Sequence, residues 1–164
     1  MKKLMFWSFV FAVSFFSFEG AALSASIANQ TVTFQVVAIN ELSVNGNPGA
    51  LIVNTAASGS EPTSATDSTT TYNVTTNGTN KKITGSIDTN MPANTSLKIN
   101  LTAPAEATSA GAVILTTSPV DLITGITQKA ENGRGITYTF TANVAAGIIA
   151  SDTRTVTLTL TDGS

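Results

Sequence analysis

The chain of 164 residues contains neither cysteine nor histidine. Without cysteine it has no disulfide, no thiol nucleophile and no site for N-terminal lipid attachment. Without histidine it lacks the commonest general base at neutral pH, and the two absences together exclude metal sites of the Cys/His type. We therefore expect no cofactor, no metal ion and no catalytic residues, unless carboxylates alone form a site.

The carboxylates are few and scattered. Charged residues make up 11% of the chain, and most acidic residues lie beside turn residues, as in Glu61–Pro62 and Asp162–Gly163. This distribution is typical of solvated loop charges, so we predict that the protein is not an enzyme. A carboxylate pair of the glycosidase type, converging in space, is the alternative. Asp67, Asp88 and Asn90 offer oxygen ligands but lack the spacing of a calcium loop.

Positive charge is scarce as well. The chain has 8 Lys and Arg residues against 10 Asp and Glu residues, and Lys81–Lys82 is the one cationic pair outside the N-terminus. A protein that binds nucleic acid needs a surface that neutralises phosphates. The sequence therefore predicts no nucleic-acid partner.

Most aromatic residues lie in an N-terminal segment with the features of a signal peptide. Lys2 and Lys3 precede the apolar run Leu4–Phe18, and small residues follow it. The run is about 15 residues long, which suits an export signal and is short for a membrane helix. We predict a signal peptide over residues 1–25 and one domain over 26–164, with no membrane span after cleavage. The exact cleavage site stays open, and a retained N-terminal anchor is the alternative.

Beyond residue 25, threonine and asparagine alternate with aliphatic residues. This period of two residues predicts half-buried strands. The clearest examples are GITYTFTANV (135–144), TRTVTLTLT (153–161) and SLKINLTA (96–103). About eight to ten short strands separated by turns predict an all-β fold, an Ig-like antiparallel β-sandwich with Greek-key connections. A jelly roll is the alternative.

Three local features complete the expected fold. Leu42–Val44 and Ala50–Asn54 flank the turn sequence NGNPG and are expected to form a hairpin. Thr55–Ser68 is polar and is expected to be an exposed loop. Aromatic residues that alternate with aliphatic ones are expected in the core, which argues against an aromatic sugar-binding platform: Phe34, Tyr138 and Phe140.

The stretch TVTFQVVAI, residues 31–39, has the alternation of a strand. Its apolar face consists of Val32, Phe34, Val36 and Ala38. Two interpretations fit this pattern: the stretch is the first strand of a self-contained sandwich, or it completes the sheet of a neighbouring subunit. The hydrophobic pattern is the same for both, so the sequence leaves the choice open.

The chain resembles the major fimbrial subunits of the alternate chaperone–usher class, the colonization-factor-antigen type. The resemblance rests on an exported, cysteine-free chain and on four segments: NQTVTFQVVAI, ELSVNGNPGALIV, YNVTTNGTNKKITGSI and the terminal TVTLTLTDGS. It covers most of the chain beyond the signal, at the level of pattern. It implies an Ig-like sandwich that lacks its last strand, the gap being filled by the N-terminal extension of the next subunit.

The resemblance also assigns roles to individual residues. The donor residues that enter the neighbour's groove would be Val32, Phe34, Val36 and Ala38. The strand Thr153–Thr161 would border the acceptor groove and pair with a periplasmic chaperone, its groove-facing residues being Val156, Leu158 and Leu160. The chain departs from the pattern of some pilins because no aromatic residue lies near its C-terminus. The need for a chaperone therefore stays open.

The sequence thus predicts a secreted structural subunit of a bacterial fimbria or pilus. It would reach the cell surface through the periplasm, assemble with copies of itself or with neighbouring pilus subunits, and contribute to adhesion. The alternative is a self-contained secreted β-sandwich that binds a carbohydrate or a host protein. Oligomeric state, and whether Phe34 is buried in its own chain, distinguish the two.

Overall fold

The computed structural model describes residues 26–164, and the predicted signal peptide lies outside the described residues. The chain divides into two units, Met1–Gln35 and Val36–Ser164. The described part of the first unit, residues 26–35, is exposed and contains no strand or helix. The second unit contains the regular structure, and we call its residues 37–164 the body.

Within residues 26–164 the chain forms nine strands and one short 3₁₀ helix. The strands are β1 (Asn40–Asn45), β2 (Ala65–Thr76), β3 (Lys81–Ile87), β4 (Thr95–Leu101), β5 (Thr108–Ser109), β6 (Val113–Ile114), β7 (Val120–Ile126), β8 (Lys129–Ala142) and β9 (Val156–Asp162). The 3₁₀ helix η1 covers Val144–Ala146.

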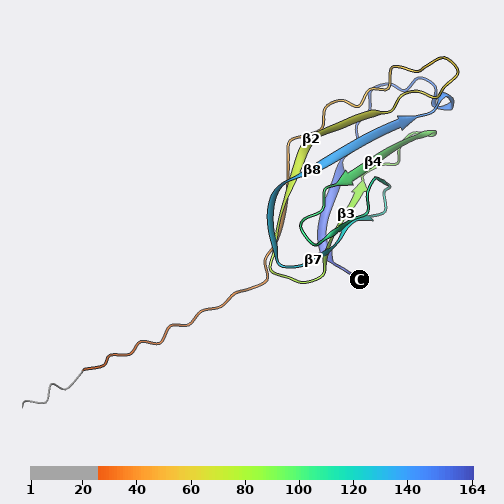
Figure 1. The fold of residues 1–164 in the computed structure, drawn as a ribbon. Coiled ribbons are helices and arrows are strands. Elements are labelled where there is room, and N and C mark those ends of the chain that lie inside the picture. Colours follow the sequence, from red (N-terminus) through yellow and green to blue (C-terminus); the bar gives the residue numbers. More distant parts are fainter. Residues whose placement is uncertain (1–25) are drawn as a thin grey trace, which may run out of the picture. The chain divides into compact units, whose positions relative to one another are not determined.

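The strands form two antiparallel sheets. One sheet has the order β1-β2-β8-β4-β6, and the other has the order β5-β7-β3-β9. Figure 1 shows the two long strands β2 and β8 side by side, paired from Thr76↔Lys129 to Ala65↔Phe140. The predicted all-β fold with two antiparallel sheets is confirmed, and the Ig-like Greek-key connectivity stays a prediction.

The apolar core draws its side chains from both sheets. Tyr72, Ile99 and Ile136 come from the first sheet, and Ile83 and Ile123 come from the second. In β2, β4 and β8 buried residues alternate with more exposed ones, as the sequence pattern indicated. In β3 and β7 neighbouring residues are buried together, and the pairing of these two strands shifts register at Ile83.

Tyr72 is one of two tyrosines in the core and the only aromatic residue of β2. Its ring is fully buried, and its hydroxyl donates a hydrogen bond to the carbonyl oxygen of Thr102 at 2.7 Å. Burial raises the pKa of this phenol above its usual range, with the nearby Arg134 acting in the opposite direction. The hydroxyl therefore acts as a neutral donor that satisfies a carbonyl beyond the end of β4.

Replacing Tyr72 by phenylalanine should lower the free energy of unfolding by about 1–2 kcal/mol, because the Thr102 carbonyl loses its partner while the ring stays in place. Urea unfolding followed by circular dichroism measures the change. Tyr138→Phe is the matched control, since the Tyr138 hydroxyl has no hydrogen-bond partner among the described residues. Equal losses in the two variants would contradict the assigned role of the Tyr72 hydroxyl.

The predicted hairpin around NGNPG is wrong. Residues 50–54 form no strand, and β1 pairs with β2 instead. The Gly49 N–H donates to the Asp67 carboxylate at 3.2 Å, and Leu51 packs against the core. These tertiary contacts hold the segment near the start of β2 rather than beside β1.

Two predicted boundaries also need correction. The exposed loop predicted to run to Ser68 ends earlier, because β2 begins at Ala65 and pairs there with the end of β8. Val144, the last residue of the strand predicted over 135–144, lies in η1, because β8 ends at Ala142. Its N–H donates to the Glu61 carboxylate at 2.8 Å, and the chain leaves the sheet at this point.

Candidate functional site

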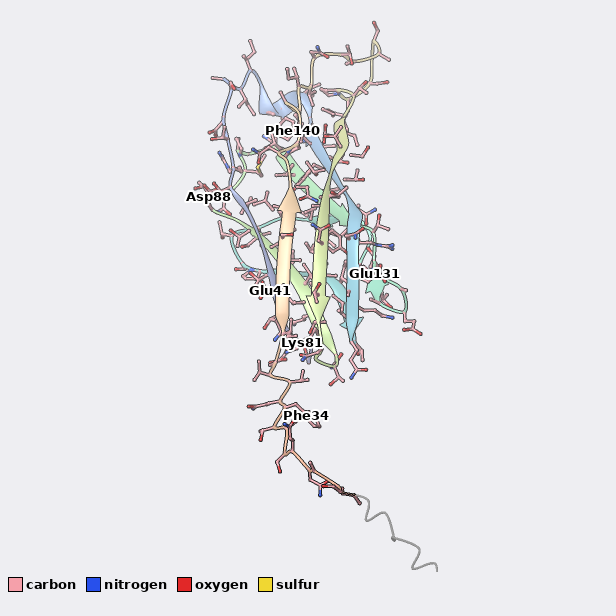
Figure 2. All side chains as sticks on the ribbon, turned by 90° about the vertical axis from the view of Figure 1, so that its left-hand side faces the viewer. Phe34, Glu41, Lys81, Asp88, Glu131 and Phe140 are labelled. Carbon is pink, nitrogen blue, oxygen red and sulfur yellow. The ribbon has the colours of Figure 1, made fainter. Side chains whose placement is uncertain are left out.

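The strand β9 forms an open edge of the body. It pairs with β3 on one side, and it is the last strand of its sheet among residues 26–164. The strand β1 is likewise the last strand of the other sheet. Figure 2 looks onto this side of the molecule, with β1, which carries Glu41, facing the viewer. Two sheet edges therefore lie on the same side of the core.

In β9 the backbone N–H and C=O groups of every second residue face the open edge. The Thr155 carbonyl accepts a hydrogen bond from the Asp88 N–H at 3.1 Å, and the Gly163 N–H donates to the Asn80 carbonyl at 2.7 Å. Because backbone groups of an antiparallel strand alternate in direction, the odd-numbered residues between these two face β3. The N–H and C=O groups of Val156, Leu158 and Leu160 consequently face outward, where the described chain supplies no partner strand.

A groove of about 1260 Å³ lies along this open edge. One wall consists of β1 and the segment that follows it, and the other consists of β9 and the segment that precedes it. The floor is formed by apolar side chains of β4 and β8. The large apolar residues of the lining are Leu42, Val44, Leu51, Ile52, Val53, Met91, Leu97, Ile136, Tyr138, Phe140, Val144, Ile149, Val156 and Leu158.

The structure places two of the three predicted acceptor residues on the groove wall. Val156 and Leu158 line the groove, and both are partly buried against the core. Leu160 also packs against the core, but it lies beyond the groove, toward the end of β9 that pairs with Lys81. The groove therefore follows the first half of β9.

Sequence reasoning missed the opposite wall of the groove. Leu51, Ile52 and Val53 were expected in a hairpin strand, whereas they line the groove without pairing to a strand. Met91 lies in the irregular segment between β3 and β4 and carried no signal of its own. An apolar run in a segment that forms no strand is the feature that marks this wall.

One ion pair lies at the edge of the groove. Arg154 donates to the Asp152 carboxylate at 2.7 Å and to the Asn90 carbonyl at 3.0 Å. The hydrogen bond from Arg154, followed by that from the Thr153 N–H, holds the pKa of Asp152 below its usual value. Both charges are thus matched within the body, and the rest of the lining is uncharged. Such a groove suits an uncharged occupant.

Residues 26–36, which we call the arm, carry three of the four predicted donor residues. Val32, Phe34 and Val36 are all largely exposed, Phe34 to 89%. The expectation that Phe34 lies in the core is therefore wrong in this structure, and so is the interpretation of residues 31–39 as a first strand of the same sandwich. The reason is the register of β1 and β2. Asn40, the first residue of β1, pairs with Thr76, the last residue of β2, so β2 ends before it could pair with residues that precede Asn40.

Residues Val37–Ile39, which we call the root, are fixed to the body by Asn77. The Asn77 side chain donates to the Val37 carbonyl at 2.7 Å and accepts from the Ile39 N–H at 2.8 Å. The Asn77 N–H also donates to the Ile39 carbonyl at 3.2 Å. Ala38, the fourth predicted donor residue, lies between these two anchored residues. It therefore belongs to the root, and the freely placed alternating stretch ends at Val36.

Residues 26–164 hold no group of three or more acidic side chains placed to bind a metal ion. They also include no helix that is long and apolar enough to cross a membrane.

Comparisons of this chain with protein-family models, with curated proteins and with solved structures found no match in any of the three.

Proposed function

We propose that this chain is a structural subunit of a bacterial surface fimbria or pilus, and that it polymerises by β-strand complementation. The arm of one copy adds to the open edge of β9 in the next copy and fills the groove. One observation carries the proposal: within residues 26–164, an exposed alternating segment has no strand partner, and a groove lies beside a strand edge that has none either.

The arm and the groove match in chemistry. Residues 26–39 include no charged side chain, and the groove is lined largely by aliphatic and aromatic residues. Full burial of a side chain such as Phe34 or Val32 contributes about 1.5–3 kcal/mol each. The added strand would also provide hydrogen-bond partners for the outward backbone groups of Val156 and Leu158, which removes an exposed edge.

The position of the root favours one direction for the added strand. The root is fixed beside Asn77, at the end of the body where β2 turns into β3. The groove extends toward the other end, where Asp152 and Thr153 lie in its lining. Suppose that two copies stack end to end and the arm of one enters the other's groove at the end lined by Asp152 and Thr153. Val36, the C-terminal residue of the arm, would then lie near the start of β9. The arm would therefore run antiparallel to β9.

The proposal also specifies a cellular location and assembly partners. The predicted signal peptide would export the chain to the periplasm, and copies of the chain or related pilus subunits would assemble at the cell surface with a role in adhesion. The body would be an Ig-like sandwich that lacks its last strand. A periplasmic chaperone would occupy the open edge before assembly, because an unpaired apolar edge promotes aggregation.

Removing residues 26–36 should convert a polymer into monomers. We expect residues 26–164 to give a ladder on unheated SDS gels that collapses on heating, and large species by size-exclusion chromatography. The chain that begins at Val37 should stay monomeric and should bind an added 26–36 peptide. This truncation keeps the root and its hydrogen bonds to Asn77, so a folded body is expected.

A stable monomer from the intact chain would contradict the proposal. It would favour the self-contained binding module with a carbohydrate or host-protein ligand. A peptide with Phe34 and Val32 replaced by serine is the matched control, because it keeps the length and backbone of the arm and loses its apolar face.

A further inference from the structure

We propose that assembled copies also touch end to end, with an apolar loop of one copy packed against the root of the next. The loop consists of residues 144–150, and we call it the tip. This inference rests on the proposed strand complementation and adds a second contact between the same two copies.

The tip exposes apolar side chains on a backbone that is held in place. Ile148 is completely exposed, at 104% of its reference area, and Val144 is exposed as well. The Val144 N–H donates to Glu61 at 2.8 Å, and the Asn94 side chain donates to the Ala145 carbonyl at 3.2 Å. These bonds fix the first half of the tip to the body, so Val144 lies on a backbone that is held in place. Ile148 follows this fixed half and extends the exposed apolar surface of the tip.

The root exposes the second apolar surface. Val37 is 64% exposed and Ile39 is 41% exposed, although the backbone of both residues is bonded to Asn77. Both residues lie immediately before the polar edge strand β1, whose own residues are Asn40, Glu41, Leu42, Ser43, Val44 and Asn45. The root is therefore an apolar spot on a rigid part of the body.

The tip and the root lie at opposite ends of the body. Asn77 follows Thr76, which pairs with Lys129 at the start of β8, whereas the tip begins two residues after Ala142 at the end of β8. A strand of this length spans roughly 40 Å at about 3.3 Å per residue. Two surfaces so far apart cannot cover each other within one copy. Copies stacked end to end would bring them together.

The short connection between arm and root makes this contact obligatory. Val36 is the last arm residue with a side chain for the groove, and Ile39 is already bonded to the body of its own copy. Three residues span at most about 10 Å. The root must therefore lie within that distance of the groove entrance in the next copy. Val144 and Ile149 of the tip line the groove at that entrance.

A substitution in the tip tests the end contact separately from strand exchange. In the chain of residues 26–164, Ile148→Asp should weaken polymers because a carboxylate replaces the buried isoleucine at the contact. We expect at least a tenfold rise in the protein concentration needed for half-polymerisation, measured by size-exclusion chromatography. Ile114→Asp is the matched control, since Ile114 is also exposed but lies on β6, at the far edge of the first sheet. It should polymerise normally.

Peptide binding separates the two proposals. A labelled 26–36 peptide should bind equally well to full chains carrying Phe34→Asp alone and Phe34→Asp with Ile148→Asp, because the peptide has no root. Adding Val37→Lys to the Ile148→Asp chain should restore polymerisation, because the new lysine in the root of one copy can form an ion pair with the new aspartate in the tip of its neighbour. Normal polymers from Ile148→Asp, with the peptide still bound, would overturn the end contact alone. Failure of the peptide to bind either chain would overturn strand complementation, and the end contact with it.

Discussion

Replacing Phe34 by aspartate should leave the body folded and abolish polymers. The side chain is almost fully exposed in the isolated chain, so its removal costs no packing within the body. In the proposed complex it is the largest residue that enters the groove. Losing its burial and placing a carboxylate among apolar residues should raise the dissociation constant of the arm by at least ~100-fold. Size-exclusion chromatography and unheated SDS gels measure the loss.

The matched control for this prediction is the next residue along the arm. Gln35→Asp introduces the same charge, but Gln35 lies on the opposite face of the alternating stretch and would point out of the groove. It should polymerise nearly as well as the unchanged chain. If both variants lose polymers equally, the effect comes from charge on the arm and not from an apolar face that enters a groove.

Replacing Leu158 by aspartate should also abolish polymers, but from the acceptor side. Leu158 lines the groove from β9, and its backbone faces the open edge. A carboxylate here would meet the apolar face of the incoming arm and should again weaken binding by about 100-fold or more. Thr157→Asp is the control on the same strand, since Thr157 is exposed on the outer face. Circular dichroism and thermal unfolding show whether each variant folds, and Val156→Asp provides a second acceptor variant nearer the groove entrance.

Mixing the two variants gives the sharpest result. The Phe34→Asp chain keeps an intact groove, and the Leu158→Asp chain keeps an intact arm. Neither should polymerise alone, but an equimolar mixture should form a one-to-one pair and nothing longer. A mixture that stays monomeric while both chains are folded would argue against a head-to-tail exchange between these two sites.

The fold could be predicted from the sequence where side chains alternate in a strand with two neighbours. Leu97, Ile99 and Leu101 share a buried face in β4, as their spacing indicated. The alternation failed at Ala50–Asn54 and at Phe34, where the pattern was apolar but the backbone had no strand beside it. Side-chain periodicity reports which face of a strand is apolar, but it does not report what supplies the hydrogen bonds.

The candidate site could be predicted only in part for the same reason. Val156 and Leu158 were identifiable because they lie on a regular strand, whereas Met91 and Leu51 reach the groove from irregular segments. The role of Asn77 had no signal in the sequence. Its side chain bonds to residues 38 and 40 positions earlier, and such a contact depends on the path of the whole chain.

The attachment of the root to Asn77 has a mechanical consequence. In a fibre built as proposed, tension would pass from the groove of one copy into the arm of the next and then through Val37–Ile39 into its body. Three hydrogen bonds to one residue hold that connection, and the β1–β2 pairing begins immediately after it. A pull on the arm would load these three bonds before it reaches the sheet. Asn77 would therefore act as the first element to yield under force, and its release would lengthen the link between copies while leaving both sandwiches folded.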